Sequence, residues 1–205
     1  MHIIQELLIS ESDHPVAKTV NAIIDMDIED SSGQSPFLCA LRQTLPDYSH
    51  FFLDVIEEKL KGNDAITNKI PDLHRANIKH GFPIHMAILS HKFEIALRIL
   101  TIRNNLVDPH ITTSIGANII HLLFVKYDKD PDTAFKILLE CIRMGVDVNH
   151  IDDLDAAPIH VALRKRQYQV INDCIRINMQ RQDPLFNLNM VDKKGMTGLH
   201  YAVEK

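Results

Sequence analysis

Histidine is the residue type in this sequence best suited to chemistry, and the chain has 12 of them. An imidazole ring binds metal ions and transfers protons near neutral pH. Four of the histidines share one setting, with an apolar residue directly before and another two positions after. These are His85, His121, His160 and His200, separated by 36, 39 and 40 residues. Such nearly even spacing indicates a repeated structural position rather than one reactive site.

The same spacing argues against a metal centre. No two histidines stand four positions apart in an H-E-x-x-H pattern. Histidines in stacked copies of a unit would lie about one repeat apart, much farther than the roughly 2.1 Å of a zinc–nitrogen bond. We therefore expect no metal and no cofactor. The four histidines are predicted to pack where a turn meets a helix and to hydrogen-bond nearby backbone.

Alternating acidic residues from Asp128 to Asp132 resemble the start of a calcium-binding loop. A complete loop needs glycine at its sixth position and a bidentate glutamate at its twelfth. This chain has Thr133 and Leu139 there. We expect instead a polar loop with an acidic cap for the helix that carries Phe135.

The three cysteines, Cys39, Cys141 and Cys174, lie far apart and among apolar residues, without a C-x-x-C pair. A catalytic cysteine needs an exposed, activated thiolate beside a base, whereas these positions predict buried or half-buried thiols. The chain also has no G-x-x-x-x-G-K-[ST], G-x-G-x-x-G or G-x-S-x-G motif. We expect no catalytic residue, so the chain is predicted not to be an enzyme.

Charge is distributed unevenly along the chain. Residues 1–60 contain 3 Lys and Arg against 11 Asp and Glu, whereas a basic run, RKRQY, spans Arg164 to Tyr168. Two readings of this run remain open: a solvated helix end, or a patch that contacts an acidic partner surface. The overall charge of -5 gives no reason to expect nucleic acid.

No run approaches the roughly 18 apolar residues of a membrane span, and the N-terminus lacks the basic region of a secretory signal peptide. We therefore expect no membrane span and an intracellular, cytoplasmic protein.

The elements that position the histidines are predicted by the residues around them. Segments DSSGQSPFLCA from Asp30 and DKKGMTGLHYA from Asp192 begin with the same D-x-x-G. Aspartate and glycine favour a tight turn, Ser or Thr then caps a helix, and proline is tolerated in its first turn. Apolar residues farther on, such as Ile95 and Ile99, predict the inward face of a second helix.

These segments together resemble the ankyrin repeat, whose pattern is D-x-x-G-x-T-P-L-H-x-A. The segment CIRMGVDVNHID, from Cys141 to Asp152, is similar to the end of such a repeat. The resemblance implies an all-α solenoid of stacked helix-turn-helix units joined by hairpin-like turns, in one domain over 1–205. The expected units are 1–29 with helices near Ile3–Ile9 and Val16–Met26, 30–76, 77–112, 113–151, 152–191 and an incomplete 192–205.

Departures from the pattern are local. The turn glycine is replaced by His80 in one unit and by Asp155 in another, and Phe82 and Ala157 cannot cap a helix. Longer spacings than the family's roughly 33 residues predict inserts. We place these at Leu45–Asp47, Gly62–Leu73, Tyr127–Pro131 and Arg181–Pro184.

The family resemblance implies partner binding through turn tips and the exposed side of the first helices. Ile115, Leu154 and Met196 would then form an apolar strip, with basic residues beside it. The residues expected to contact a partner are Lys79, Ile115, Leu154, Arg164, Lys165, Arg166, Tyr168, Lys193, Lys194 and Met196.

Two functions remain open. One is a non-catalytic protein–protein interaction module that recognises a partner protein with an acidic surface. The other is the recognition arm of a larger enzyme or secreted effector, because the composition is also similar to ankyrin proteins that intracellular bacteria secrete into the host cytoplasm. The last unit stops within its first helix and leaves Leu199 and Val203 uncovered. A longer natural protein or self-association through this half-repeat would explain that.

Overall fold

The computed structural model describes residues 28–43, 48–61, 73, 81–102 and 107–203. Over these ranges the regular secondary structure is helical apart from isolated bridge residues, such as the pair Thr112 and Asn118, so the all-α prediction is confirmed. The helices expected near Ile3–Ile9 and Val16–Met26, the unit 1–29 for the most part, and Lys79 lie outside the described residues.

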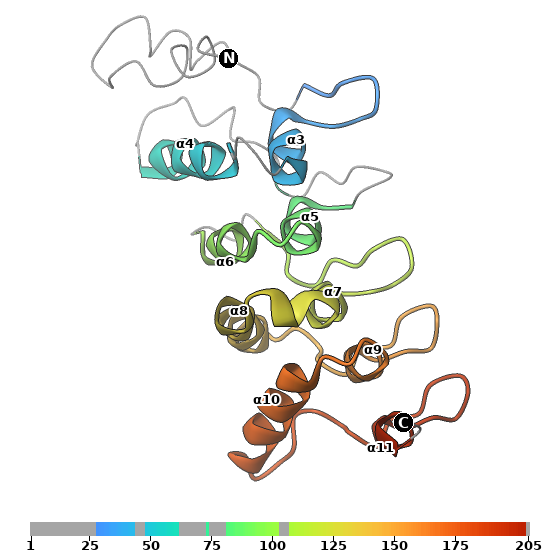
Figure 1. The fold of residues 1–205 in the computed structure, drawn as a ribbon. Helices are drawn as coiled ribbons and strands as arrows, with labels where there is room; N and C mark the ends of the chain where they lie inside the picture. The colour runs from blue at the N-terminus through green and yellow to red at the C-terminus, as the bar shows by residue number, and fades with distance from the viewer. Residues whose placement is uncertain (1–27, 44–47, 62–72, 74–80, 103–106, 204–205) are drawn as a thin grey trace, which may run out of the picture.

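The described helices alternate between short and longer ones, which stand in two columns in Figure 1. The first column contains α3 (Pro36–Arg42), α5 (Pro83–Leu89), α7 (Ile119–Lys126), α9 (Pro158–Arg164) and α11 (Gly198–Val203). The second contains α4 (Ser49–Lys61), α6 (Phe93–Thr101), α8 (Pro131–Arg143) and α10 (Tyr168–Met179). A 3-10 turn, η2 (Tyr127–Lys129), joins α7 to α8.

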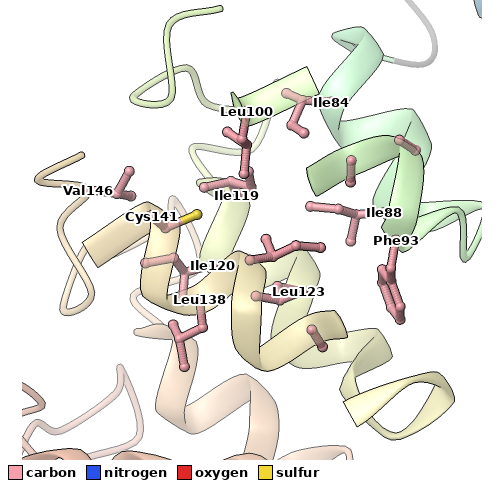
Figure 2. Close-up of a cluster of buried hydrophobic side chains, with 14 of the residues drawn as sticks. Ile84, Ile88, Phe93, Leu100, Ile119, Ile120, Leu123, Leu138, Cys141 and Val146 are labelled. Carbon is pink, nitrogen blue, oxygen red and sulfur yellow. The ribbon is translucent and has the colours of Figure 1, made fainter. Parts of the chain in front are cut away.

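Successive helix pairs pack on one another as layers. Helix α7 contacts α5 before it and α9 after it, while α6 contacts α8 and α10 contacts α8. Figure 2 shows the core between the columns, a single cluster that includes Ile88 from α5, Ile120 from α7, and Leu138 and Cys141 from α8. Each layer therefore buries its apolar faces largely against its neighbours.

The first helices begin where capping chemistry predicts. Ser35 Oγ accepts a hydrogen bond from Leu38 N at 3.3 Å, and Asn118 Oδ1 accepts one from Ile120 N at 3.1 Å. Asp130 caps α8 by accepting from Thr133 N at 3.2 Å, as expected for the polar loop. Helices α5 and α9, which start after Phe82 and Ala157, have proline at their first position and no side-chain cap bond.

A turn precedes most of the first helices and is held by an aspartate. Asp152 Oδ1 accepts from Leu154 N and Ala156 N, both at 2.9 Å. Asp30 and Asp192 make the corresponding pairs of bonds in their own turns. The turn survives replacement of its glycine, because Asp155 adopts the left-handed conformation itself, with φ of 55°.

Two of the inserts expected from the sequence lie within the described residues, and both form connections between helices. Residues 127–131 make η2 and open α8, and residues 181–184 are an exposed loop after α10. Among the described residues, no helix has both the length and the apolar character needed to cross a membrane.

Candidate protein-interaction surface

Two of the four motif histidines tie a turn to the next layer. His121 Nδ1 accepts a hydrogen bond from Asn118 N at 3.3 Å, and its Nε2 donates to Ala156 O at 2.9 Å. His160 makes the same two kinds of bond, accepting from Ala157 N at 3.1 Å and donating to Met190 O at 2.9 Å. Both rings are buried and have donor and acceptor sites occupied, so they act as structural links.

The other two motif histidines, His85 and His200, differ from His121 and His160. His85 is fully buried, yet neither ring nitrogen has a hydrogen-bond partner among the described residues. Burial lowers its pKa to about 4, and an interaction with the backbone of Ile111 acts in the opposite direction. His200 accepts from Thr197 N at 3.1 Å, but its ring is exposed.

Burial raises the pKa of the cysteine thiols. The pKa of Cys141 is raised to about 12, and that of Cys174 is raised as well. Cys39 is half-buried, and partial burial also raises its pKa. A thiolate is the reactive form, and burial disfavours it at all three positions. Within the described ranges, no three His, Cys, Asp or Glu side chains are grouped to hold a metal ion.

Two of the predicted contact residues lie on adjacent turn tips. Ile115 is 49% exposed and Leu154 is 48% exposed. Asp153 N donates to Ile115 O at 3.0 Å, and His150 Nε2 donates to Gly116 O at 2.9 Å. The approach is so close that a Cβ on Gly116 would lie 2.6 Å from a carboxylate oxygen of Asp153. The two tips therefore form one linked surface, which we call the turn surface.

The turn surface extends to residues that the sequence analysis did not single out. Ile151 and Val191 each precede the turn aspartate of their layer, and both are exposed. Their shared position before Asp152 and Asp192 was a signal available in the sequence. Met196, by contrast, is half-buried. Its side chain therefore adds less exposed apolar area to the expected strip than Ile115 or Leu154 does. Its backbone N–H donates a hydrogen bond to Asp192 Oδ1.

The predicted basic residues that the structure describes are at the surface. Lys193 and Lys194 are exposed on the turn before α11, which projects away from the second column in Figure 1. Arg164, Lys165 and Arg166 are exposed where α9 ends, and Tyr168 is exposed at the start of α10. This second group lies on the connection between the two helix columns.

Behind these surfaces, a polar network around the buried Asp173 connects two layers. The hydroxyl of Tyr127 donates to Asp173 Oδ2 at 2.9 Å, and Arg176 Nη2 binds Asp173 Oδ1 at 2.9 Å. The Arg176 guanidinium also lies 5.0 Å from the ring centroid of Phe135. Tyr127 and Phe135 belong to one layer and Asp173 and Arg176 to the next, so the network holds two layers in fixed relation.

No protein-family model matches the chain, and no curated protein matches it.

Proposed function

We propose that this chain is a stack of ankyrin-type repeats that binds a partner protein and does no chemistry of its own. The layered helix pairs, the recurring aspartate turns and the histidine links between layers support the ankyrin reading. The observation that carries the binding proposal is the pair of exposed apolar tips, Ile115 and Leu154, on turns that are hydrogen-bonded together.

The turn surface has the properties of an interaction site. Protein interfaces commonly combine an apolar centre with a polar rim, and here the exposed Asp153 lies beside the tips, because its N–H donates to Ile115 O. The backbone links between turns pre-organise the surface, which reduces the entropy lost on binding. The basic residues near it favour a partner that is acidic around an apolar anchor.

A second candidate is the recognition arm of a larger enzyme or secreted effector. The observation that favours it is the apolar side of α11, where Leu199 is 71% exposed although its counterparts Ile84, Ile120 and Ile159 are buried. In the other layers this position is covered by the following layer. An open apolar face favours further protein packed on α11, from a partner, a second copy or a larger protein.

Site-specific photo-crosslinking tests the binding proposal. A benzoylphenylalanine is placed at Ile115 or Leu154, and at Leu139 as a control, because Leu139 is 44% exposed on α8 in the second column. We expect one protein of defined mass to be crosslinked in cells from both tip positions and not from Leu139. Equal crosslinking from all three positions, or none from the tips, would contradict the proposal.

A further inference from the structure

Two consecutive connections between the helix columns carry five cations, and the first of them, with the start of α8, also carries exposed Asp128, Asp130 and Asp132. One is the end of α7 with η2, and the other joins α9 to α10. We call the five cations on them the basic loop surface: Lys126, Lys129, Arg164, Lys165 and Arg166. This surface is separate from the turn surface of Ile115 and Leu154.

Gln167 ties the two connections together. Its Nε2 donates to Val125 O at 3.2 Å, and its Oε1 accepts from Asp128 N at 2.9 Å. The preceding connection, between α5 and α6, lies beside them: burial and then the charges of Lys126 and Lys129 lower the pKa of His91. The cations therefore lie on consecutive connections that the Gln167 side chain joins by hydrogen bonds.

The cations of this surface differ from arginines elsewhere in the described structure. Arg98 binds Asp54 and Glu57 at 2.8 and 2.9 Å, and Arg143 binds Glu140 at 2.5 Å. Among the described residues, no ion pair involves any cation of the basic loop surface. Asp130, the acidic residue at the end of η2, is already used as the cap of α8. The positive field of this surface is therefore available to an external anion.

Backbone geometry fixes one of these cations at a cost. Arg166 has φ of 58°, a left-handed conformation that favours glycine, within a helix-ending turn closed by bonds from Arg166 N to Leu163 O and from Gln167 N to Ala162 O. Arg166 is exposed, and Tyr168, two residues later, is 60% exposed. Arginine and tyrosine are the side chains most enriched among residues that dominate binding energy.

We propose that the basic loop surface binds an acidic protein segment, a short run of Asp and Glu side chains. Charge complementarity selects an acidic partner. A short protein segment fits better than a long nucleic-acid strand, because Asp128 and Asp132 lie exposed beside the cations and interrupt the positive charge. A long polyanion would meet those carboxylates, whereas a short acidic segment contacts the cations alone.

Fluorescence anisotropy with a fluorescein-labelled octaglutamate peptide tests this surface. We expect saturable binding to the full chain that weakens at least about tenfold between low and physiological salt, since exposed charges are screened. The variant Lys165→Glu/Arg166→Glu should lose binding by about tenfold or more. The control Lys193→Glu/Lys194→Glu makes the same charge change on the turn surface and should stay within about twofold.

Each other outcome overturns the proposal. Equal losses in the two double variants would indicate non-specific attraction, and absence of saturable binding would indicate a merely solvated patch. Tighter binding of an eight-nucleotide single strand would assign the surface to nucleic acid instead. Leu154→Asp should leave octaglutamate binding unchanged, so failure here and failure of the turn surface are distinguishable.

Arg166→Gly separates binding from folding. Glycine relieves the left-handed backbone, so this variant should melt at a higher temperature and yet bind octaglutamate about threefold or more weakly. Higher stability with unchanged affinity would show that Arg166 does not take part in binding at the basic loop surface.

Discussion

At the scale of single residues, the motif histidines share a sequence setting but not an environment. His121 and His160 have both ring nitrogens hydrogen-bonded, His85 is buried without a partner among the described residues, and His200 is exposed. The sequence predicts the common position, because it depends on nearby residues. It does not predict the partner of Nε2, which comes from the following layer about 30 residues later.

The buried ring of His85 makes stability depend on pH. The pKa of His85 is about 4 in the folded chain and 6.5 when the ring is exposed. Between these two pH values, the unfolded chain therefore binds a proton at this ring and the folded chain does not. Stability is therefore full above about pH 6.5 and falls by up to about 3 kcal/mol as the pH drops toward 4. His121, whose pKa burial also lowers, acts in the same direction.

Urea unfolding at pH 7.5 and pH 5 measures this effect. The variant His85→Gln should show a clearly smaller loss of stability between the two pH values than the native chain. The same loss in both proteins would mean that other groups produce the pH dependence.

The left-handed residue Arg166 gives a second prediction at this scale. Glycine at this position should raise the free energy of unfolding by about 1 kcal/mol, since it carries no Cβ to clash. For a chain of this length, that corresponds to a melting temperature about 2–4 °C higher. Calorimetry should show the gain for Arg166→Gly and none for Arg166→Ala, which retains a Cβ; equal gains in both would refute the strain argument.

At the scale of elements, the helix starts were largely predictable and their tertiary partners were not. Proline at Pro36, Pro83 and Pro158 with a preceding extended residue marks the start of three of the five short helices. The loop after α7 was expected as an insert, but its 3-10 turn buries Tyr127 fully. That burial depends on Asp173, 46 positions later, which local sequence patterns do not reveal.

The Tyr127–Asp173 bond should matter to the cohesion of two layers. Tyr127→Phe removes a donor from a buried carboxylate, so we expect the free energy of unfolding to fall by about 1–3 kcal/mol. Tyr168→Phe is the control, because its exposed hydroxyl should change stability by less than about 0.5 kcal/mol. Chemical denaturation of both variants tests this, and similar values would show that the buried bond contributes little.

At the scale of the whole molecule, stacking of the described layers leaves an apolar face of α11 exposed. The residue directly before the motif histidine is buried in three layers but is the exposed Leu199 in α11, and Val203 one turn on is exposed too. We expect this face to drive self-association, which sedimentation equilibrium detects as a mass that rises with concentration. Leu199→Glu/Val203→Glu should remain monomeric, whereas Leu139→Glu should not; a native chain that is monomeric throughout would contradict this expectation.

We expect a partner protein to meet the stack through the turn surface. Once the crosslinked partner is purified, calorimetric titration measures its affinity for the variants Leu154→Asp and Leu139→Asp. The two leucines are nearly equally exposed, but Leu154 lies on a turn tip and Leu139 lies on α8. We expect Leu154→Asp to weaken binding by about 2 kcal/mol or more, roughly thirtyfold, as for a central interface residue. Leu139→Asp should leave the affinity unchanged. Loss of affinity in Leu139→Asp alone, or in neither variant, would contradict partner binding through the turn surface.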